Sequence, residues 1–454
     1  MRTRSVLGPL VLAVMLTSCS SLFPWGNGPD FVKVEGTQLT VGSAPYRFVG
    51  TNVWYGFYLG SPGSTGDRER LRRELDRLRS LGIENLRVLA ASEASYMPRA
   101  VTPALQRAPG VLDDSLLAGL DFLLAEMAER DMRAVLYLTN YWEWSGGMVQ
   151  YNVWADGGPG VDPEDPALGW PAFMNFAASF YANVRANALY RTYIRNLVTR
   201  ENTVNGRPYA TDPTIMSWQL ANEPRPGTLG PEGEKNIEPY AAWIEGTAVY
   251  IHSLDTVHLV SSGSEGVTGS LLSPELFVRT HRTRAIDYLT FHLWPFNWGW
   301  FDPKRAEETY PEALEKSLAY LAQHIALARE LGKPIVLEEF GLGRDSGAVA
   351  LSVPTTWRDR FYRAILTAAA DSARAGAPIA GTNFWAWGGE GRGRNNDGMW
   401  RPGDPFVGDP SQEPQGMYSV FDSDTSTMEI LRDMAAVMRR ISQGDSLLAG
   451  GDTP

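Results

Sequence analysis

The chain has 454 residues, of which 44% are hydrophobic, so it is long enough to bury a large core. Its formal net charge of −11 and its pI near 5.1 exclude the basic face that a nucleic-acid-binding protein requires. The negative net charge is compatible with an uncharged partner. The 15 Trp and 18 Tyr exceed what a core of this size needs.

The N-terminus is predicted to be an export signal followed by a tether. A basic start precedes an apolar run at residues 6–16, which is too short to span a bilayer. The following Leu16-Thr17-Ser18-Cys19 resembles the cleavage region of a bacterial lipoprotein. We therefore expect residues 1–18 to be a lipoprotein signal peptide, Cys19 to carry the lipid, and residues 19–30 to be a polar tether.

An ordinary signal peptide that happens to contain a cysteine is the alternative. Ser20 directly after Cys19 resembles the pattern of lipoproteins that are sorted to an outer membrane. The prediction is thus an exported bacterial protein, either anchored to the outer membrane by lipid alone or secreted or periplasmic. Since Cys19 is the only cysteine, an internal disulfide and a thiolate metal site are excluded.

Apolar runs alternate with helical patterns from residue 31 to residue 443. A hairpin is expected at residues 31–41, where it would close the bottom of the fold. Strands are expected at residues 46–52, 83–89, 133–139, 258–262, 288–292 and 379–385, and two more lie within the stretches 215–224 and 332–341. Helices are expected at residues 67–81, 115–129, 240–254, 311–331, 356–375 and 427–441, and a long helix, either continuous or broken, at 173–200.

Eight strands alternating with helices predict a closed parallel sheet, the (β/α)8 TIM barrel of the α/β class. We expect one catalytic domain over residues 31–443 and a C-terminal tail at residues 444–454. Two long segments without a period, an aromatic loop at 140–170 and a Gly/Pro-rich insertion at 388–416, are predicted to be loop insertions.

Two of the predicted strands end in carboxylates. The first runs into Asn222-Glu223-Pro224, and Pro224 ends the strand because it has no backbone N–H to donate. The other ends in Glu338-Glu339-Phe340-Gly341. Strand carboxyl ends form the mouth of such a barrel, where chemistry takes place, and hydrolysis of a glycosidic bond needs two carboxylates there. A structural alternative for Glu223 is to cap the following helix.

These strand ends resemble those of glycoside hydrolase family 5. Three more motifs, in order along the chain, narrow the resemblance to the β-1,4-mannanase branch of that family. They are Trp142-Glu143-Trp144-Ser145-Gly146-Gly147-Met148-Val149-Gln150-Tyr151, His292-Leu293-Trp294-Pro295 and Phe384-Trp385-Ala386-Trp387-Gly388-Gly389.

The resemblance implies a role for each carboxylate. Glu223 corresponds to the acid/base, and Glu339 corresponds to the nucleophile, because it directly precedes the aromatic-Gly pair. Arg87 corresponds to the arginine that supports the nucleophile, and Asn222 to the donor to the 2-hydroxyl of the sugar. We expect Glu223 to begin protonated and Glu339 to begin ionised. Because side chains alternate along a strand, Glu338 is expected to face away from the site.

Further residues are expected to bind or support the substrate. They are Asn140, Trp142, His292, Trp294 and Trp385, with Trp144, Gln150, Tyr151 and Trp154 as walls of outer subsites. Trp385 corresponds to the ring that stacks under the sugar, and plain core packing is its alternative. Two positions depart from the family: Trp294 stands where relatives often have Tyr, and Tyr137 where many have His.

The resulting prediction is a retaining endo-β-1,4-mannanase that hydrolyses mannan, glucomannan or galactomannan as a monomer, without a cofactor or a metal. The alternatives within the family are an exo-acting β-mannosidase or mannobiohydrolase and a β-1,4-endoglucanase. The alternative from another class is a non-catalytic glycan-binding lipoprotein. The Glu223/Glu339 pair with Arg87 disfavours this last alternative, because a binding protein needs no matched acid and nucleophile.

Overall fold

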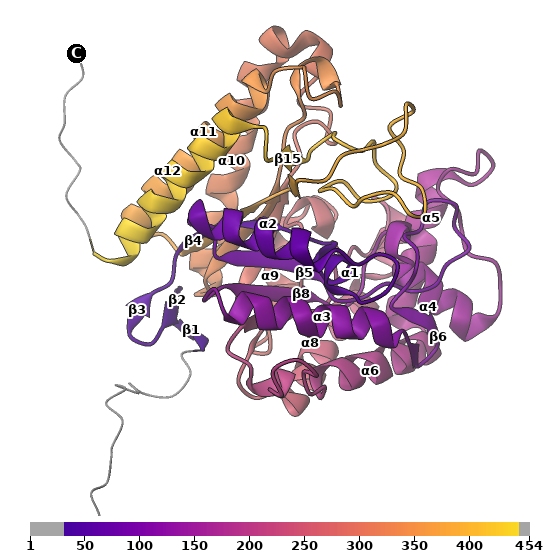
Figure 1. Cartoon of the computed structure of the whole chain (residues 1–454). Coiled ribbons are helices and arrows are strands. Elements are labelled where there is room, and N and C mark those ends of the chain that lie inside the picture. Colours follow the sequence, from indigo (N-terminus) through magenta and orange to yellow (C-terminus); the bar gives the residue numbers. More distant parts are fainter. Residues whose placement is uncertain (1–30, 445–454) are drawn as a thin grey trace, which may run out of the picture. The chain divides into compact units, whose positions relative to one another are not determined.

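The computed structural model describes residues 31–444, which form one compact unit around an eight-stranded parallel sheet (Figure 1). The strand order is β10-β9-β8-β5-β4-β13-β12-β11. These strands are β4 (Phe48–Asn52), β5 (Asn85–Leu89), β8 (Arg133–Tyr137), β9 (Ile215–Gln219), β10 (Leu259–Ser261), β11 (Leu289–Leu293), β12 (Ile335–Phe340) and β13 (Ile379–Phe384). The predicted (β/α)8 barrel is confirmed.

The barrel closes between β10 and β11 without a continuous ladder. The Asp287 N–H donates to the Val260 carbonyl at 2.9 Å, and the His292 N–H donates to the Glu265 carbonyl at 3.2 Å. The Thr290 hydroxyl adds a bond to the Ser264 carbonyl at 2.8 Å. This seam fixes the loop after β10 to the mouth end of β11.

Helices surround the sheet, and several of them bury one apolar stripe. In α2 (Arg68–Ser80) the side chain of Asp67 accepts the Arg70 N–H at the N-terminus, while Leu71, Leu75 and Leu78 are buried at helical spacing. The other main helices are α1 (Gly56–Gly60), α3 (Asp114–Ala128), α6 (Val184–Val198), α8 (Ile237–Leu254), α9 (Pro274–His281), α10 (Ala306–Leu331), α11 (Thr356–Arg374) and α12 (Thr425–Ser442). In Figure 1, α12 lies alongside α11.

The predicted hairpin plugs the bottom of the barrel. It consists of β1 (Val32–Glu35) and β2 (Gln38–Val41), followed by the short β3 (Ala44–Pro45). Val32 and Leu39 are buried in one apolar cluster with residues at the start of the barrel strands. Those residues are Phe48, Val135, Met216, Leu259, Tyr288, Val336 and Ala380. Water is thereby excluded from the end of the barrel opposite the mouth.

The aromatic segment at 140–170 is not the irregular loop that we expected. It contains a 3₁₀ turn, η1 (Glu143–Ser145), the helix α4 (Gly147–Asp156) and the start of α5 (Gly169–Ala178). The buried residues of α4 fall on several sides of the helix, so its sequence shows no amphipathic stripe by which to detect it.

Of the two alternatives for the long helix expected at 173–200, the structure has the broken one. The chain passes from α5 through a 3₁₀ turn, η2 (Ser179–Ala182), into α6. Asn183 starts the new helix, since its side chain accepts the Ala186 N–H.

The insertion at 388–416 is largely irregular, as predicted, apart from β14 (Trp387–Gly389), which pairs with β15 (Val420–Phe421). Of the remaining predictions, the signal peptide at 1–18, Cys19, the tether at 19–30 and nearly all of the tail at 444–454 lie outside the described residues. Within residues 31–444, no helix combines the length and the apolar character that crossing a bilayer requires.

Replacing Leu39 by Ala should lower the free energy of unfolding by about 2–5 kcal/mol, because the substitution leaves a cavity in the cluster at the barrel bottom. Urea denaturation measures the change. Turnover should be unaffected, since Leu39 lies at the end opposite the mouth. The control is Val184→Ala, at a side chain that is 82% exposed, where we expect a change within about 0.5 kcal/mol. Equal effects of the two substitutions would refute the role of the plug.

Candidate active site

A pocket of about 570 Å³ opens at the carboxyl ends of the barrel strands. Both predicted catalytic carboxylates, Glu223 and Glu339, line it. Its other walls are mostly aromatic, and they include Trp142, Trp144, Trp294 and Trp385. The location agrees with the general rule for parallel barrels, in which the strand ends carry the chemistry.

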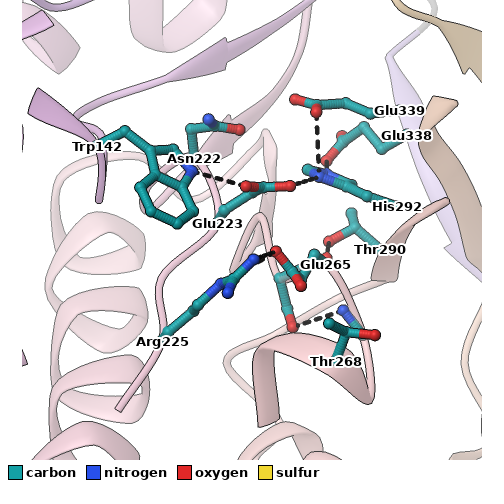
Figure 2. Close-up of polar contacts among 12 residues, drawn as sticks. Trp142, Asn222, Glu223, Arg225, Glu265, Thr268, Thr290, His292, Glu338 and Glu339 are labelled. Atoms are coloured by element: carbon teal, nitrogen blue, oxygen red, sulfur yellow. Dashed lines mark hydrogen bonds and ion pairs between the residues drawn. The ribbon is translucent and has the colours of Figure 1, made fainter. Parts of the chain in front are cut away.

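Glu223 follows β9 in a constrained conformation. Its φ is +49°, a left-handed value that is uncommon for a residue other than glycine, and Pro224 comes next. Its carboxylate accepts hydrogen bonds from Trp142 Nε1 and from His292 Nδ1, both at 2.7 Å. Figure 2 shows these two donors reaching the carboxylate from opposite sides. The side chain therefore has a single fixed orientation towards the pocket.

Glu339, at the end of β12, is held by Arg87 from β5. The guanidinium of Arg87 is fully buried, and its Nη1 donates to Glu339 Oε1. Its remaining donors bind Asn52 Oδ1 at 3.1 Å, Gln219 Oε1 at 2.8 Å and Asn222 Oδ1 at 2.8 Å. These bonds fix the guanidinium, and with it the position of the Glu339 carboxylate at the mouth.

His292 stands between the two carboxylates. Its Nδ1 lies 2.7 Å from Glu223 Oε1 and 3.2 Å from Glu339 Oε2. One oxygen of each carboxylate and one ring nitrogen of His292 all lie within 4.8 Å of one another. The carboxyl groups of retaining glycosidases are about 5–5.5 Å apart, and those of inverting enzymes about 6.5–9.5 Å. The spacing therefore fits retention, because an inverting enzyme needs room for a water molecule.

The same three side chains are the group of titratable residues, among those described, that is close enough to hold a metal ion. A cation there would compete with the proton on His292. All three are already held by contacts with one another, with Arg87 and with Trp142.

The protonation state differs from our expectation. Burial alone would lower the pKa of His292, but Glu339 and the hydrogen bonds to the surrounding carboxylates outweigh it and raise this pKa well above its usual value. Burial likewise would raise the pKa of Glu223, but the bond to His292 and its charge lower it instead. These shifts favour a protonated His292, one hydrogen bond away from Glu223.

Glu338 does not face away from the site, as alternation had suggested. Leu337 pairs with Phe291 and Glu339 pairs with His292, so Glu338 is the extra residue of a β-bulge. Its Oε2 accepts Gln219 Nε2 at 2.7 Å and lies 3.4 Å from Arg87 Nε, and the side chain is 1% exposed. The bulge turns both neighbouring carboxylates inwards, onto one guanidinium.

Asn222 and Asn140 form a support beneath the pocket. The amide oxygen of Asn222 accepts from Arg87, and its nitrogen donates to Asn140 Oδ1 at 3.1 Å. Asn140 is fully buried, and its own amide donates to the Ser145 hydroxyl at 3.1 Å. Asn222 lines the pocket and Asn140 does not, so Asn140 orients a pocket residue from behind.

The predicted aromatic walls are only partly brought together. Trp294 packs edge-on against Trp385, with ring centroids 6.2 Å apart, and both rings line the pocket. Trp144 also lines it, but Gln150, Tyr151 and Trp154 do not. The ring of Tyr151 is buried among core aromatics, and Trp154 packs on its edge. Helix α4 directs these residues into the core, which a loop would not have done.

Sequence reasoning missed several residues at the mouth. Arg225 lies over the ring of Trp142, with its guanidinium carbon 4.9 Å from the ring centre, and forms an ion pair with the buried Glu265. Glu413, from the insertion, also lines the pocket. Arg225 lies two residues after Glu223, so its position was a usable signal. Glu265 follows the expected strand at 258–262, and Glu413 lies in the insertion after the strand at 379–385, so both segments belong to the mouth. The sequence does not show that these two side chains are buried there.

Comparisons with known proteins place the chain among mannoside-cleaving enzymes. A family model described as GH family 5 beta-mannosidase-like matches residues 29–443. Mannan endo-1,4-beta-mannosidase 4 of Oryza sativa subsp. japonica is 31% identical, over 80% of this chain and 75% of that protein. Mannan endo-1,4-beta-mannosidase 7 of Arabidopsis thaliana is 30% identical, over 84% of this chain and 83% of that protein.

Among solved structures, the family 5 mannosidase from Rhizomucor miehei is 36% identical, with a TM-score of 0.84 over 92% of this chain and 100% of that one. A mutant of the same enzyme has been solved in complex with mannosyl-fructose. The endo-1,4-beta-mannanase from the same organism shares the fold, at 23% identity and a TM-score of 0.64 over 90% of this chain and 99% of that one.

His292→Gln should destabilise the protein most at mildly acidic pH. The raised pKa of His292 contributes stability below its unfolded value of 6.5, and this contribution is lost as the pH rises through the folded value. The lowered pKa of Glu223 contributes stability above its unfolded value of 4.5, and this contribution is lost as the pH falls through the folded value. Urea unfolding at several pH values should show the largest difference from wild type between these two values. A difference that does not vary with pH would contradict the charged pair.

Proposed function

Since the chain belongs to glycoside hydrolase family 5, we propose that it is a retaining endo-β-1,4-mannanase that cleaves mannan, glucomannan or galactomannan. The observation that carries the proposal is the Glu223–His292–Glu339 group, whose closest atoms lie within 4.8 Å. Relatives over most of the chain's length are named mannan endo-1,4-beta-mannosidases. The residue roles below are inferred from geometry and family membership together.

In the first step Glu339 attacks the anomeric carbon while the leaving oxygen takes a proton from Glu223. Arg87 holds the nucleophile in position through their ion pair. The proton that resides on His292 passes to Glu223 along their 2.7 Å hydrogen bond as the sugar oxygen arrives. The product of this step is a glycosyl ester of Glu339.

In the second step a water molecule attacks the ester, and Glu223 removes its proton. The pair of Glu223 and His292 gave one proton to the leaving group in the first step. Esterification has also removed the negative charge of Glu339 beside His292. The pair can therefore accept a proton from water. Two successive displacements at the same carbon retain its configuration.

Asn222 is suited to bind the 2-hydroxyl of the sugar. Arg87 fixes its amide oxygen, and Asn140 takes one of its two amide hydrogens. The other hydrogen is left for a substrate hydroxyl. Mannose and glucose differ at this hydroxyl, which is axial in mannose, and a site built to bond a hydroxyl in one orientation discriminates against the other.

A second candidate, an exo-acting β-mannosidase, is favoured by one observation. Pro410, Gln412 and Glu413 of the insertion line the pocket, so this segment forms a wall beside the catalytic pair. A wall there limits the room for further sugars on the retained side of the cleaved bond. The description of the family model as beta-mannosidase-like and the similarity to a solved family 5 mannosidase from Rhizomucor miehei support this alternative.

We further propose that Cys19 carries lipid and anchors the enzyme to a membrane, as expected from the Leu16-Thr17-Ser18-Cys19 motif. The support is the sequence pattern and the position of Cys19, twelve residues before the unit that begins at Phe31. The anchor would leave the barrel free to meet a polysaccharide.

Glu339→Ala should lower kcat by about a thousandfold or more on every substrate, since no other group forms the ester. Glu223→Ala should cost about 10²–10⁴-fold on mannan. It should cost much less on aryl mannosides with an acidic leaving group, because their first step needs little acid help. Steady-state kinetics on both substrate types measure the difference. If the two variants lose activity equally on both types, the division of roles is wrong.

Mannan or glucomannan should be cleaved about a hundredfold faster than carboxymethylcellulose, which corresponds to about 3 kcal/mol in the transition state. An endo-enzyme should convert mannohexaose to products of intermediate length at the earliest times. Chromatography of the initial products distinguishes the two candidates. Release of mannose alone from the first minutes would replace the endo proposal with the exo alternative.

Cys19→Ser should convert a membrane-associated protein into a soluble one with unchanged specific activity, because residues 19–30 precede the catalytic unit. Fractionation of cells that express the chain with its own signal makes the measurement. If the wild-type protein is recovered fully in the soluble fraction, the anchor proposal fails.

A further inference from the structure

Residues 408–416 of the insertion form a firmly attached wall of the pocket. Trp54 Nε1 donates to the Gly408 carbonyl at 2.9 Å, and the Ser411 hydroxyl donates to the Arg99 carbonyl at 2.5 Å. Asp409 fastens the segment internally, because its carboxylate accepts the N–H groups of Gly416 at 2.7 Å and of Tyr418 at 2.6 Å. A segment held in this way can present side chains to a ligand without a large entropic cost.

The wall stands across the barrel from the acid/base. Its contacts are with Trp54 after β4, Arg99 after β5 and Ala386 after β13, where a Cβ on Gly408 would lie 2.8 Å from the Ala386 carbonyl. Glu223 follows β9, which is separated from β13 by three strands on either side in the strand order. Since Glu223 protonates the leaving group, the departing part of the substrate lies on the β9 side. The retained sugar therefore lies towards the wall.

Two side chains of this wall have polar atoms without a partner. Glu413 Oε2 and Gln412 Oε1 are buried, and no group in residues 31–444 lies within hydrogen-bonding distance of either. Both residues line the pocket. A buried polar group without a partner costs about 1–3 kcal/mol, so such atoms are commonly those that a ligand satisfies.

The surroundings of Glu413 set its chemistry. Burial raises the pKa of its carboxyl group well above the usual value, and the nearby Asp409, Glu339 and Glu223 raise it further. A neutral carboxyl group has one O–H to donate and can still accept. It therefore matches a sugar hydroxyl, which also donates and accepts.

We propose that Glu413, with Gln412, is a specificity-determining residue that binds hydroxyl groups of the retained mannosyl unit other than its 2-hydroxyl. The inference rests on the proposed function, since it takes Glu223 as the acid and the pocket as the sugar site. Asn222 binds the hydroxyl next to the anomeric carbon, and the wall binds hydroxyls on the far side of the same ring. The two contacts together select the configuration of the sugar whose bond is cleaved.

The test measures kcat/KM on aryl β-mannosides and aryl β-mannobiosides, and on analogues that lack the 3-, 4- or 6-hydroxyl of the retained unit. The kcat/KM of wild type should be about 10–100-fold lower for at least one analogue than for the parent, as expected for a site built around a hydroxyl. Glu413→Ala should have a kcat/KM at least about tenfold below that of wild type on the parent substrate. In this variant the kcat/KM for that analogue should lie within about threefold of the value for the parent. Glu413→Gln should recover part of the loss, because an amide also donates and accepts.

The control is Glu390→Ala, which removes a carboxylate of the same insertion that is paired with Arg73 outside the pocket. It should leave all rates unchanged, and unfolding curves should confirm that each variant is folded. The inference is overturned if Glu413→Ala stays within threefold of wild type on the parent, or if it keeps every wild-type analogue penalty. If wild type cleaves glucosides and not mannosides, the proposed substrate is wrong, and the same series on glucosides still tests Glu413.

Discussion

The guanidinium of Arg87 is fully buried at the centre of the barrel mouth, where water cannot solvate it. Two carboxylates of one strand, Glu338 and Glu339, compensate its charge, and three amide oxygens take its other donors. Removing one partner from such a buried ion pair costs about 3–5 kcal/mol, because the remaining charge is left uncompensated. The positions of β5, β9 and β12 at the mouth are thus tied to one cation.

The positive charge of Arg87 also allows carboxylates to lie close together at the mouth. One oxygen of Glu223 and one of Glu339 lie within 4.8 Å of each other, although two like charges at that distance repel. His292 lies between them, and its raised pKa favours the positive charge that offsets this repulsion. Further out, Arg225 compensates the buried Glu265 and lies over the ring of Trp142, which itself donates to Glu223. Opposite charges therefore alternate across the mouth.

The sequence was sufficient for the barrel and for the strand ends that carry Glu223 and Glu339, because these depend on local signals. An apolar run followed by a Pro or a Gly fixes where a strand stops, and the mouth lies at that point. The orientation of Glu338 could not be predicted in this way. It depends on a bulge opposite His292, which is a property of how two strands pair.

The same limit applies to the segments far from the strand ends. Helix α4 is buried on several sides and has no periodic stripe, so its residues read as a loop. Glu413 lies in a stretch without any period, and it reaches the pocket only because Trp54 and Asp409 hold that stretch across the mouth. Contacts between segments distant in sequence decide such positions, and one sequence does not reveal them.

The departures from the family pattern make sense in the light of the two-carboxylate arrangement. Trp294 has no hydroxyl to offer the nucleophile and instead packs against Trp385 and Tyr418 as a wall. The positive groups beside Glu339 are then Arg87, which donates to it, and His292, whose Nδ1 lies 3.2 Å from Glu339 Oε2. Both groups would lose a counter-charge once the nucleophile becomes an ester.

Glu338 resolves this difficulty for Arg87. It lies 3.4 Å from Nε and is not consumed in the reaction, so the buried guanidinium keeps one counter-charge while Glu339 is esterified. His292 has no such reserve close by, since its Nε2 is 3.9 Å from Glu338, and it keeps only Glu223 in hydrogen-bonding contact. The charge lost on esterification is therefore felt most by the pair of His292 and Glu223. That is the pair which must next take a proton from water.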